Sequence, residues 1–125
     1  MKEKIFIGIQ VIAGLLLVMF GSNTFLQFMP MPEMTPIMGE FMGALYKTGY
    51  IFPISAIIEI VAGIAFLSNK FASLMAIFVM PIMLNALLSH LFLDPSGIGA
   101  AAFIVFAIII VMIRNKDRYS EIFKA

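Results

Sequence analysis

The chain has 125 residues, of which 62% are hydrophobic and only 12% are charged, and its formal net charge is +1. The charged share is about half that of soluble proteins, and a domain of this size buries too little surface to hide so many apolar side chains. A soluble globular fold is therefore excluded, and we expect lipid to surround most of the chain. Cysteine is absent, which excludes disulfides and thiolate-ligated metals. No basic segment interleaved with aromatic residues indicates a nucleic-acid partner.

Four apolar runs divide the chain, and each has the length, about 17 to 23 residues, that a helix needs to cross about 30 Å of hydrocarbon. Such runs predict helices because backbone polar groups in lipid must be satisfied within the segment, whereas transmembrane strands would alternate polar and apolar residues. We predict an all-α fold: one integral membrane domain over residues 1–125, a four-helix bundle with a short amphipathic helix in the outer loop between its first two helices. The predicted transmembrane helices cover about 5–25, 50–67, 71–93 and 96–113, the outer loop covers 26–49, and a cytoplasmic tail covers 114–125.

The first run could instead be a secretory signal peptide, because Lys2 and Lys4 precede it. Its apolar stretch is longer than the usual hydrophobic core of a signal peptide, and no A-x-A cleavage site follows it. We expect this segment to be retained as the first transmembrane helix.

The outer loop carries a helix signal of its own. Thr35 followed by Pro36 offers an N-cap and a proline at the first helical position. Apolar residues then recur at helical spacing up to about Lys47, opposite Glu40, before Gly49 ends the pattern. This predicts a short amphipathic helix lying across the outer end of the bundle.

Two prolines mark the second half of the chain. Pro81 lies inside the third predicted helix and leaves the carbonyl of Ile77 without its helical hydrogen bond. Pro95 disfavours helix at Asp94, so the third helix should stop there. We expect Asp94 to cap the fourth helix, with Pro95 in its first turn, and the segment ending at Gly97 to form a tight helical hairpin.

The distribution of basic residues predicts the orientation. If four helices cross the membrane, only Lys47 lies on the side opposite to the termini. The other basic residues fall on the same side as the termini: Lys2, Lys4, Lys70, Arg114, Lys116, Arg118 and Lys124. Because cytoplasmic segments carry an excess of Lys and Arg, both termini are predicted to be cytoplasmic.

Glu59 stands out because a carboxylate inside an apolar transmembrane helix costs about 2.5 to 3.5 kcal/mol even on a lenient scale. Small residues at i±4, Ser55 and Gly63, give it a packable helix face. Two interpretations stay open: a neutral, hydrogen-bonded acid that fixes helix packing, or a group that serves a ligand, a proton or a partner. Asn85 is predicted at similar depth in the third helix and is its expected neighbour, whether as a bond between helices or as part of a site.

His90 lies nearer the outer face with Asp94 at i+4, a spacing that lets the carboxylate orient the imidazole. A structural histidine at a helix end is the competing interpretation, and one histidine with scattered acids is too weak a signal to predict a metal site. Asn23, at the outer end of the first helix, could join this layer. Gln10 sits alone near the inner end and is expected to bond a neighbouring helix. No catalytic motif occurs, so no catalytic residue is predicted.

These residues predict a pocket that opens towards the outer leaflet. Glu59, Asn85 and His90 would line it, with Asn23 at its outer edge, and the loop with its amphipathic helix would lie above it. Apolar walls with a few convergent polar groups are typical of small-molecule sites, and Glu59 should favour neutral or cationic lipophilic molecules. A bundle packed solid, with these groups bonded to one another, is the alternative.

Several segments have a familiar pattern. They are FGSNTF at 20–25, FMPMP at 28–32, IEIVAG at 58–63, Pro81 with Asn85, and HLFLDPSG at 90–97. In order and spacing, over nearly the whole chain, they resemble the DoxX family of small four-helix bacterial membrane proteins. One departure is Thr24, where many relatives carry Lys, so a cation able to pair with an outer carboxylate is missing.

The resemblance implies a bundle of four transmembrane helices in a bacterial cytoplasmic (inner) membrane. Founding members of the family are linked to quinone-coupled sulfur oxidation, and others look like accessory subunits of membrane redox or assembly complexes. We therefore expect a non-catalytic or accessory protein that binds a small lipophilic molecule, with a quinone as one candidate, or a membrane partner or second copy of itself. No cofactor is evident from the residues.

Two other functions stay open. One is a membrane oxidoreductase subunit linked to the quinone pool, although the chain has no ligands for a redox cofactor of its own. The other is a small proton-coupled transporter that uses Glu59. Small multidrug transporters share the size and one buried Glu, but they place it in the first helix and rely on tryptophan, which is absent here.

Overall fold

The computed structural model describes residues 2–125, and this range is helical with no strand. The helices are α1 (Lys2–Leu26), α2 (Pro36–Lys47), α3 (Ile51–Ser68), α4 (Ala72–Leu93), α5 (Ile98–Arg114) and a 3-10 helix, η1 (Lys116–Tyr119). The all-α prediction is confirmed. The predicted short amphipathic helix is confirmed with its bounds, and its N-cap is Thr35, whose side chain accepts a hydrogen bond from the Met38 amide.

Three of the helices are long and apolar enough to cross a membrane: α1, α3 and α4. α5 is also apolar but has 17 residues, so the predicted fourth crossing stays a prediction. Large hydrophobic side chains such as Leu15, Ile57, Phe78 and Phe106 point outwards and are half exposed or more, as expected of a surface that contacts lipid.

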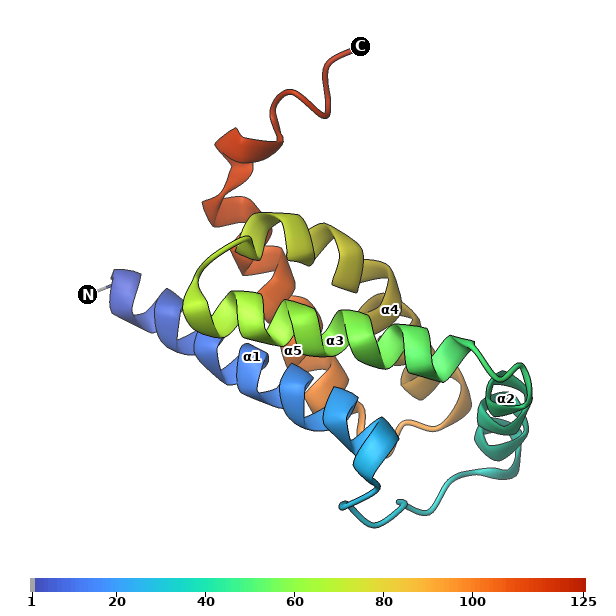
Figure 1. The fold of residues 1–125 in the computed structure, drawn as a ribbon. Helices are drawn as coiled ribbons and strands as arrows, with labels where there is room; N and C mark the ends of the chain where they lie inside the picture. Colours follow the sequence, from blue (N-terminus) through green and yellow to red (C-terminus); the bar gives the residue numbers. More distant parts are fainter. Residues whose placement is uncertain (1) are drawn as a thin grey trace.

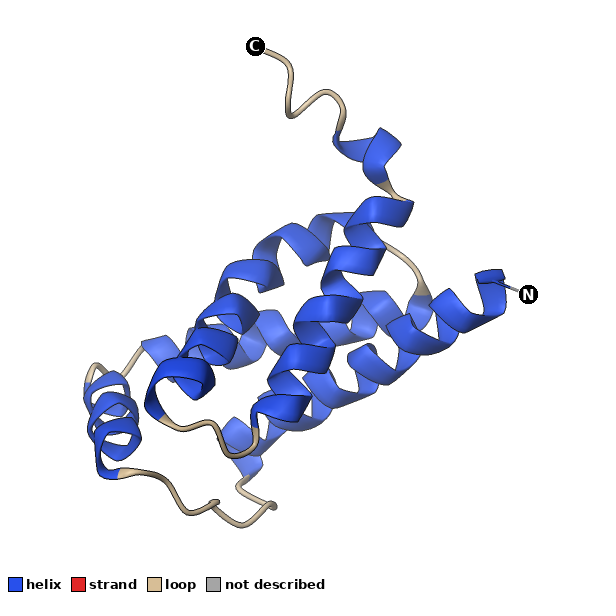
Figure 2. Ribbon diagram, turned by 180° about the vertical axis from the view of Figure 1, so that it is seen from behind, coloured by secondary structure: helices blue, strands red, loops and turns tan. Residues whose placement is uncertain are grey.

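The helices pack in pairs around one apolar core (Figure 1). α1 packs against α3 and α5, and α4 packs against α3 and α5. α2 lies across one end of this array and contacts α3 and α4, as the view from behind also shows (Figure 2). The largest side chains that are completely buried in the core come from four helices: Leu17, Phe66, Val79, Ile104, Ile108 and Val111.

α1 and α3 approach each other more closely than ordinary side chains would allow. A Cβ on Gly63 would lie 2.6 Å from Val18 Cγ2 and 2.7 Å from the Gly14 carbonyl oxygen. A Cβ on Gly21 would lie 2.9 Å from the carbonyl oxygen of Ala56. The two contact points are seven residues apart on each antiparallel helix, so both fall on one face of each. Small residues let the two backbones touch, which is the usual basis of helix association in lipid.

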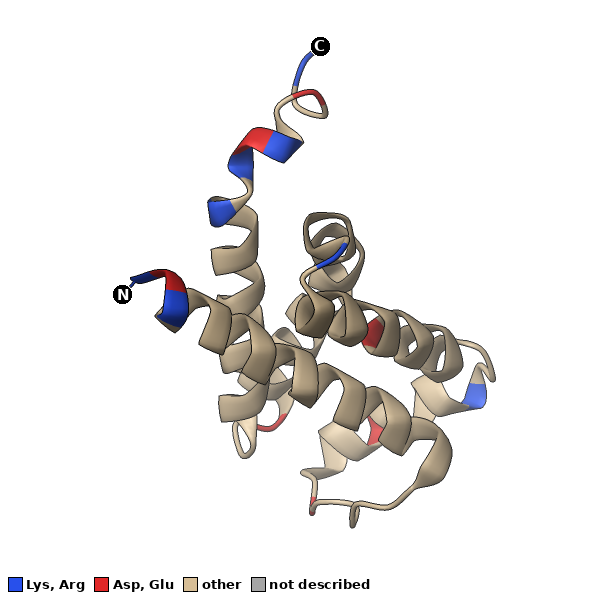
Figure 3. Ribbon diagram, turned by 60° about the vertical axis from the view of Figure 1, so that its left-hand side comes forward, with Lys and Arg blue, Asp and Glu red and all other residues tan. Residues whose placement is uncertain are grey.

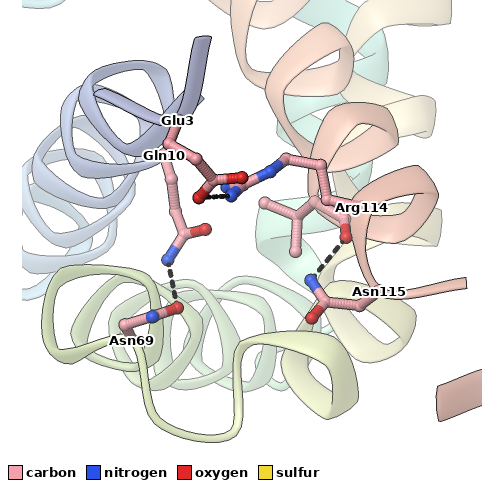
Figure 4. Close-up of polar contacts among 6 residues, drawn as sticks. Glu3, Gln10, Asn69, Arg114 and Asn115 are labelled. Carbon is pink, nitrogen blue, oxygen red and sulfur yellow. Dashed lines mark hydrogen bonds and ion pairs between the residues drawn. The ribbon is translucent and has the colours of Figure 1, made fainter. Parts of the chain in front are cut away.

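The predicted interhelical bond of Gln10 is confirmed. Its buried side-chain amide donates to the carbonyl oxygen of Phe66, at 2.9 Å, and to Oδ1 of Asn69, at 3.0 Å. Asn69 ends α3 in the left-handed conformation, which Asn tolerates better than most residues. Figure 4 shows the Gln10–Asn69 contact. These two hydrogen bonds hold α1 against α3 at the end where the α3–α4 turn lies.

Basic residues gather at that same end of the array (Figure 3). The start of α1, the α3–α4 turn and the segment after α5 all lie there, whereas α2 lies at the opposite end. Lys70 belongs to the α3–α4 turn, and Lys47 is the last residue of α2. The segment after α5 packs against α4: the Tyr119 hydroxyl donates to the carbonyl oxygen of Ser73 at 2.6 Å. We call the end of the array where the basic residues gather the basic end.

The tight α1–α3 contact gives a test of stability. Gly63→Ala should lower the free energy of unfolding by about 1 to 3 kcal/mol, because the added methyl group overpacks a backbone contact. Gly8→Ala is the matched control, since a Cβ there meets nothing within 4 Å and alanine favours helix. Thermal unfolding in detergent, followed by circular dichroism, measures both variants. Equal midpoints for the two would contradict the packing described.

Candidate ligand-binding site

A cavity of about 250 Å³ lies between α1, α3 and α4 beneath the apolar face of α2. We call it the α2 recess. Its volume is just below the range of about 300 to 1,000 Å³ that is usual for small-molecule sites. Most of its wall is apolar, and the polar members come from three helices. The lining residues are Phe20, Thr24, Met38, Phe41, Met42, Leu45, Ile51, Phe52, Ser55, Glu59, Ile82, Asn85, Ala86, Ser89 and His90.

Glu59 reaches this wall from the middle of α3. Its helix face is held against α1, because a Cβ on Gly21 would lie 3.3 Å from Glu59 Cβ. Ser55, one turn earlier on α3, lines the same recess. Within residues 2–125 the structure shows no hydrogen bond or ion pair to the Glu59 carboxyl group. A carboxyl group that is partly buried and has no partner is costly, so this group is available to a ligand or a proton.

Asn85 lies across the recess on α4 and does not bond Glu59. Both residues line the cavity. The sequence suggests that they are neighbours, whereas in the structure the cavity lies between them. The Asn85 side chain is exposed, and its main-chain carbonyl oxygen accepts a hydrogen bond from the Ser89 hydroxyl at 2.7 Å. α4 remains continuous through Pro81, which is exposed. The Asn85 amide is therefore a further donor and acceptor for a bound molecule.

The ring of His90 is oriented by backbone, not by the Asp94 carboxylate. His90 Nδ1 lies 3.2 Å from the carbonyl oxygens of both Asp94 and Ser96. Since both partners are acceptors, we assign a proton to Nδ1, which leaves Nε2 of the neutral ring as an acceptor. The i+4 spacing permits a hydrogen bond between the Asp94 carboxylate and the imidazole, but Nδ1 bonds main-chain carbonyl oxygens instead, because the chain turns back after α4 and brings them to the ring.

Asp94 has a different role from the predicted cap of the next helix. The residue at the N-cap of α5 is Gly97, and no side chain caps that helix. Instead, the Asp94 carboxylate accepts hydrogen bonds from the Ser96 hydroxyl, from the Ser96 amide at 3.2 Å and from the Thr35 amide at 3.0 Å. The Thr35 hydroxyl donates to the Leu93 carbonyl oxygen at 2.6 Å. Asp94 thus ties the α4–α5 turn to the start of α2.

The α4–α5 turn is tight, as predicted, but α5 begins later than expected. Pro95 lies in the turn rather than in the helix, and its carbonyl oxygen accepts a hydrogen bond from the Ile98 amide at 3.3 Å. Gly97 has φ of +77°, a left-handed conformation that favours glycine. Helix can start only after this residue, which explains the shift from 96 to 98.

Asn23 is not part of the recess wall. Its side-chain oxygen accepts a hydrogen bond from the Met29 amide at 2.8 Å, so it fixes the start of the loop that leaves α1. Thr24, its neighbour, lines the recess instead. Sequence reasoning missed Thr24 and Ser89 as polar wall residues, although both lie at helical spacing from other lining residues, Phe20 and Asn85.

Within residues 2–125 no group of three or more His, Cys, Asp or Glu residues is close enough to hold a metal ion.

The hydrogen bonds to Asp94 make the docking of α2 dependent on pH. The Ser96 hydroxyl and the Thr35 amide lower the pKa of the Asp94 carboxyl group below its usual 3.8. Its stabilising contribution is therefore complete above about pH 4 and is lost as the pH falls through the lowered pKa. Asp94→Ala should increase amide hydrogen exchange in the first turn of α2 severalfold at pH 7, with a shrinking difference from the parent protein below pH 3.8.

Asp117→Ala is the control, since the Asp117 side chain makes no hydrogen bond in residues 2–125. Unchanged exchange in α2 of the Asp94→Ala variant at neutral pH would contradict the role given to this carboxylate.

Comparison of the chain with family models, with curated proteins and with solved structures finds no match. The resemblance to the DoxX family therefore stays a prediction from the motifs.

Proposed function

We propose that this chain is a non-catalytic or accessory membrane protein that binds a small lipophilic molecule in the α2 recess. The observation that carries the proposal is the Glu59 carboxyl group, which faces a cavity with apolar walls and has no partner within residues 2–125. A partly buried polar group without an internal partner is costly. A ligand that supplies the missing hydrogen bonds gains that energy on binding.

The proposed setting is a bundle of four transmembrane helices in a bacterial inner membrane, with both termini cytoplasmic. The 17 residues of α5 rise about 25 Å, enough to cross a slightly thinned or locally adapted bilayer. α5 packs along α1 and α4, two of the three longer apolar helices. The concentration of Lys and Arg at the end opposite to α2 supports the orientation. The α2 recess would then lie in the outer half of the membrane.

The polar groups of the recess define the ligand chemistry. Asn85 and Ser55 can donate to a carbonyl oxygen, and Nε2 of His90 can accept from a hydroxyl or an amine. Glu59 disfavours a second anion and suits a neutral or cationic molecule. A quinone head group, which offers carbonyl oxygens when oxidised and hydroxyls when reduced, has this chemistry. The DoxX resemblance favours the same class, or a membrane protein partner at this end.

A proton-coupled transporter is the second candidate, because an unpartnered carboxyl in a cavity also suits proton exchange. An oxidoreductase subunit is a third, and it would require a redox group bound to the purified protein. An optical spectrum and analysis of extracted quinones distinguish it from a simple binding protein. Proton-driven uptake in proteoliposomes that depends on Glu59 would favour the transporter.

The proposed topology is tested by single cysteines, since the parent chain has none. Lys70→Cys should resist an impermeant thiol reagent in intact cells and react after the membrane is opened. Lys47→Cys should react in intact cells. Labelling of the Lys70→Cys variant from outside, with protection of the Lys47→Cys variant, would reverse the orientation.

Binding is tested by thermal shift with a panel of neutral, cationic and anionic lipophilic molecules that includes quinones. The parent protein should be stabilised by neutral or cationic members. Ala86→Phe should abolish the shift by filling the recess, because Ala86 is a lining residue. Glu59→Gln keeps the shape of the side chain and should abolish the preference for cations over anions.

Glu40→Gln is the matched control, since Glu40 is exposed on α2 and does not line the recess. No shift with any member of the panel, or an undiminished shift in a folded Ala86→Phe variant, would rule out this site.

A further inference from the structure

A second, smaller cavity lies at the basic end and differs in character from the α2 recess. Its volume is about 120 Å³, several times what one water molecule requires. All but one of its lining residues are polar or charged: Glu3, Ile7, Gln10, Asn69, Arg114, Asn115 and Arg118. They come from α1, the α3–α4 turn, the end of α5 and η1. We call it the basic recess; Figure 4 shows five of these residues.

Hydrogen-bond donors in the basic recess exceed the acceptors. Arg114 donates to the Glu3 carboxylate at 2.6 Å, and Arg118 donates to the Ser73 hydroxyl oxygen at 3.1 Å. Each guanidinium has five N–H groups, so most are not used by these contacts. The Asn115 amide donates to the Val111 carbonyl oxygen at 2.7 Å and retains a second N–H. Such a set of donors suits an anion with several oxygens.

The charges favour the same kind of ligand. Two guanidinium groups face one carboxylate in the lining. The side chain of Glu3 is 76% exposed, whereas that of Arg114 is 25% exposed. The acid can therefore turn out into water, while Arg114 is held in place over the Phe6 ring, 5.3 Å from its centroid. Glu3 behaves as an internal anion that an external one can replace.

One apolar side chain adjoins the basic recess. Ile7 lines it and is 47% exposed. A ligand with an anionic head group and acyl chains would contact the polar lining and this apolar side chain at once. Basic pockets at the ends of transmembrane helices are a known setting for anionic lipid head groups.

We propose that the basic recess binds a phosphate group, carried by an anionic phospholipid whose acyl chains lie along the exposed side chain of Ile7. Arg114 and Arg118 contact the phosphate oxygens, the Asn115 amide adds a neutral donor, and Glu3 competes for Arg114. This site is independent of the α2 recess and of any ligand bound there.

The test uses the full chain and native mass spectrometry after incubation with phosphatidylglycerol or phosphatidylcholine. The parent protein should retain one phosphatidylglycerol in preference to phosphatidylcholine. Arg118→Gln should weaken that binding about tenfold, as expected for the loss of a charge-assisted hydrogen bond. Glu3→Gln should strengthen it, because the competing carboxylate is removed. If the Glu3–Arg114 ion pair only stabilised the fold, Glu3→Gln would not strengthen lipid binding while Arg118→Gln weakens it.

Lys116→Gln is the matched control: it removes one positive charge at the same end, but Lys116 does not line the recess. It should change binding less than about twofold, in line with a solvent-screened charge. An equal loss in Lys116→Gln and Arg118→Gln would mean diffuse attraction to the basic end and would overturn the proposal. Unchanged or weaker binding in Glu3→Gln would overturn it as well.

Inorganic phosphate at matched ionic strength distinguishes the two sources of the anion. If phosphatidylglycerol alone raises the thermal midpoint of the parent protein, a lipid is the ligand, as proposed. If inorganic phosphate raises it equally, and Arg118→Gln abolishes the effect, the phosphate site stands but the acyl-chain contact is refuted. If neither raises it, no such site exists.

Discussion

The direct contact between the backbones of α1 and α3 determines where the polar groups of this protein can lie. Gly14 meets Gly63, and Gly21 meets Ala56, with space for hydrogen atoms but not for side chains. In lipid, apolar side chains gain little by leaving their surroundings, so close packing of this kind has to supply much of the association energy. The contact also brings Glu59 against α1 beside Gly21 and holds Gln10 within reach of Phe66. Both cavities therefore have α1 as a wall of fixed position.

A different set of hydrogen bonds closes each end of the molecule. At the basic end an amide of α1 bonds the C-terminus of α3, and an ion pair joins α1 to α5. At the other end a carboxylate of the α4–α5 turn holds the first residues of α2. In both places a side chain forms hydrogen bonds with polar groups at a helix end. Lipid offers no partners for these groups.

Much of the fold follows from the sequence because apolar length and cap chemistry are local properties. The helices at 51–68 and 72–93 coincide with apolar runs to within a residue, and α2 has the predicted bounds because Thr35 and Pro36 fix its start. The site was harder to predict because it depends on contacts between segments far apart in the chain. Asp94 bonds Thr35, 59 residues away, whereas the sequence pattern suggested only its neighbours. His90 was likewise assigned a partner by spacing, and the folded backbone supplies others.

The seven-residue separation between the two contact points of α1 has a consequence for changes in chain length. Each residue added to a helix rotates everything beyond it by about 100°. One residue inserted between Gly14 and Gly21 would turn one of them away from α3 and replace it with a bulky neighbour. The loop at 30–33, whose residues are exposed, can absorb the same insertion at little cost, since closing a slightly longer loop changes its entropy only weakly. Insertions should thus be tolerated between α1 and α2 but not within this part of α1.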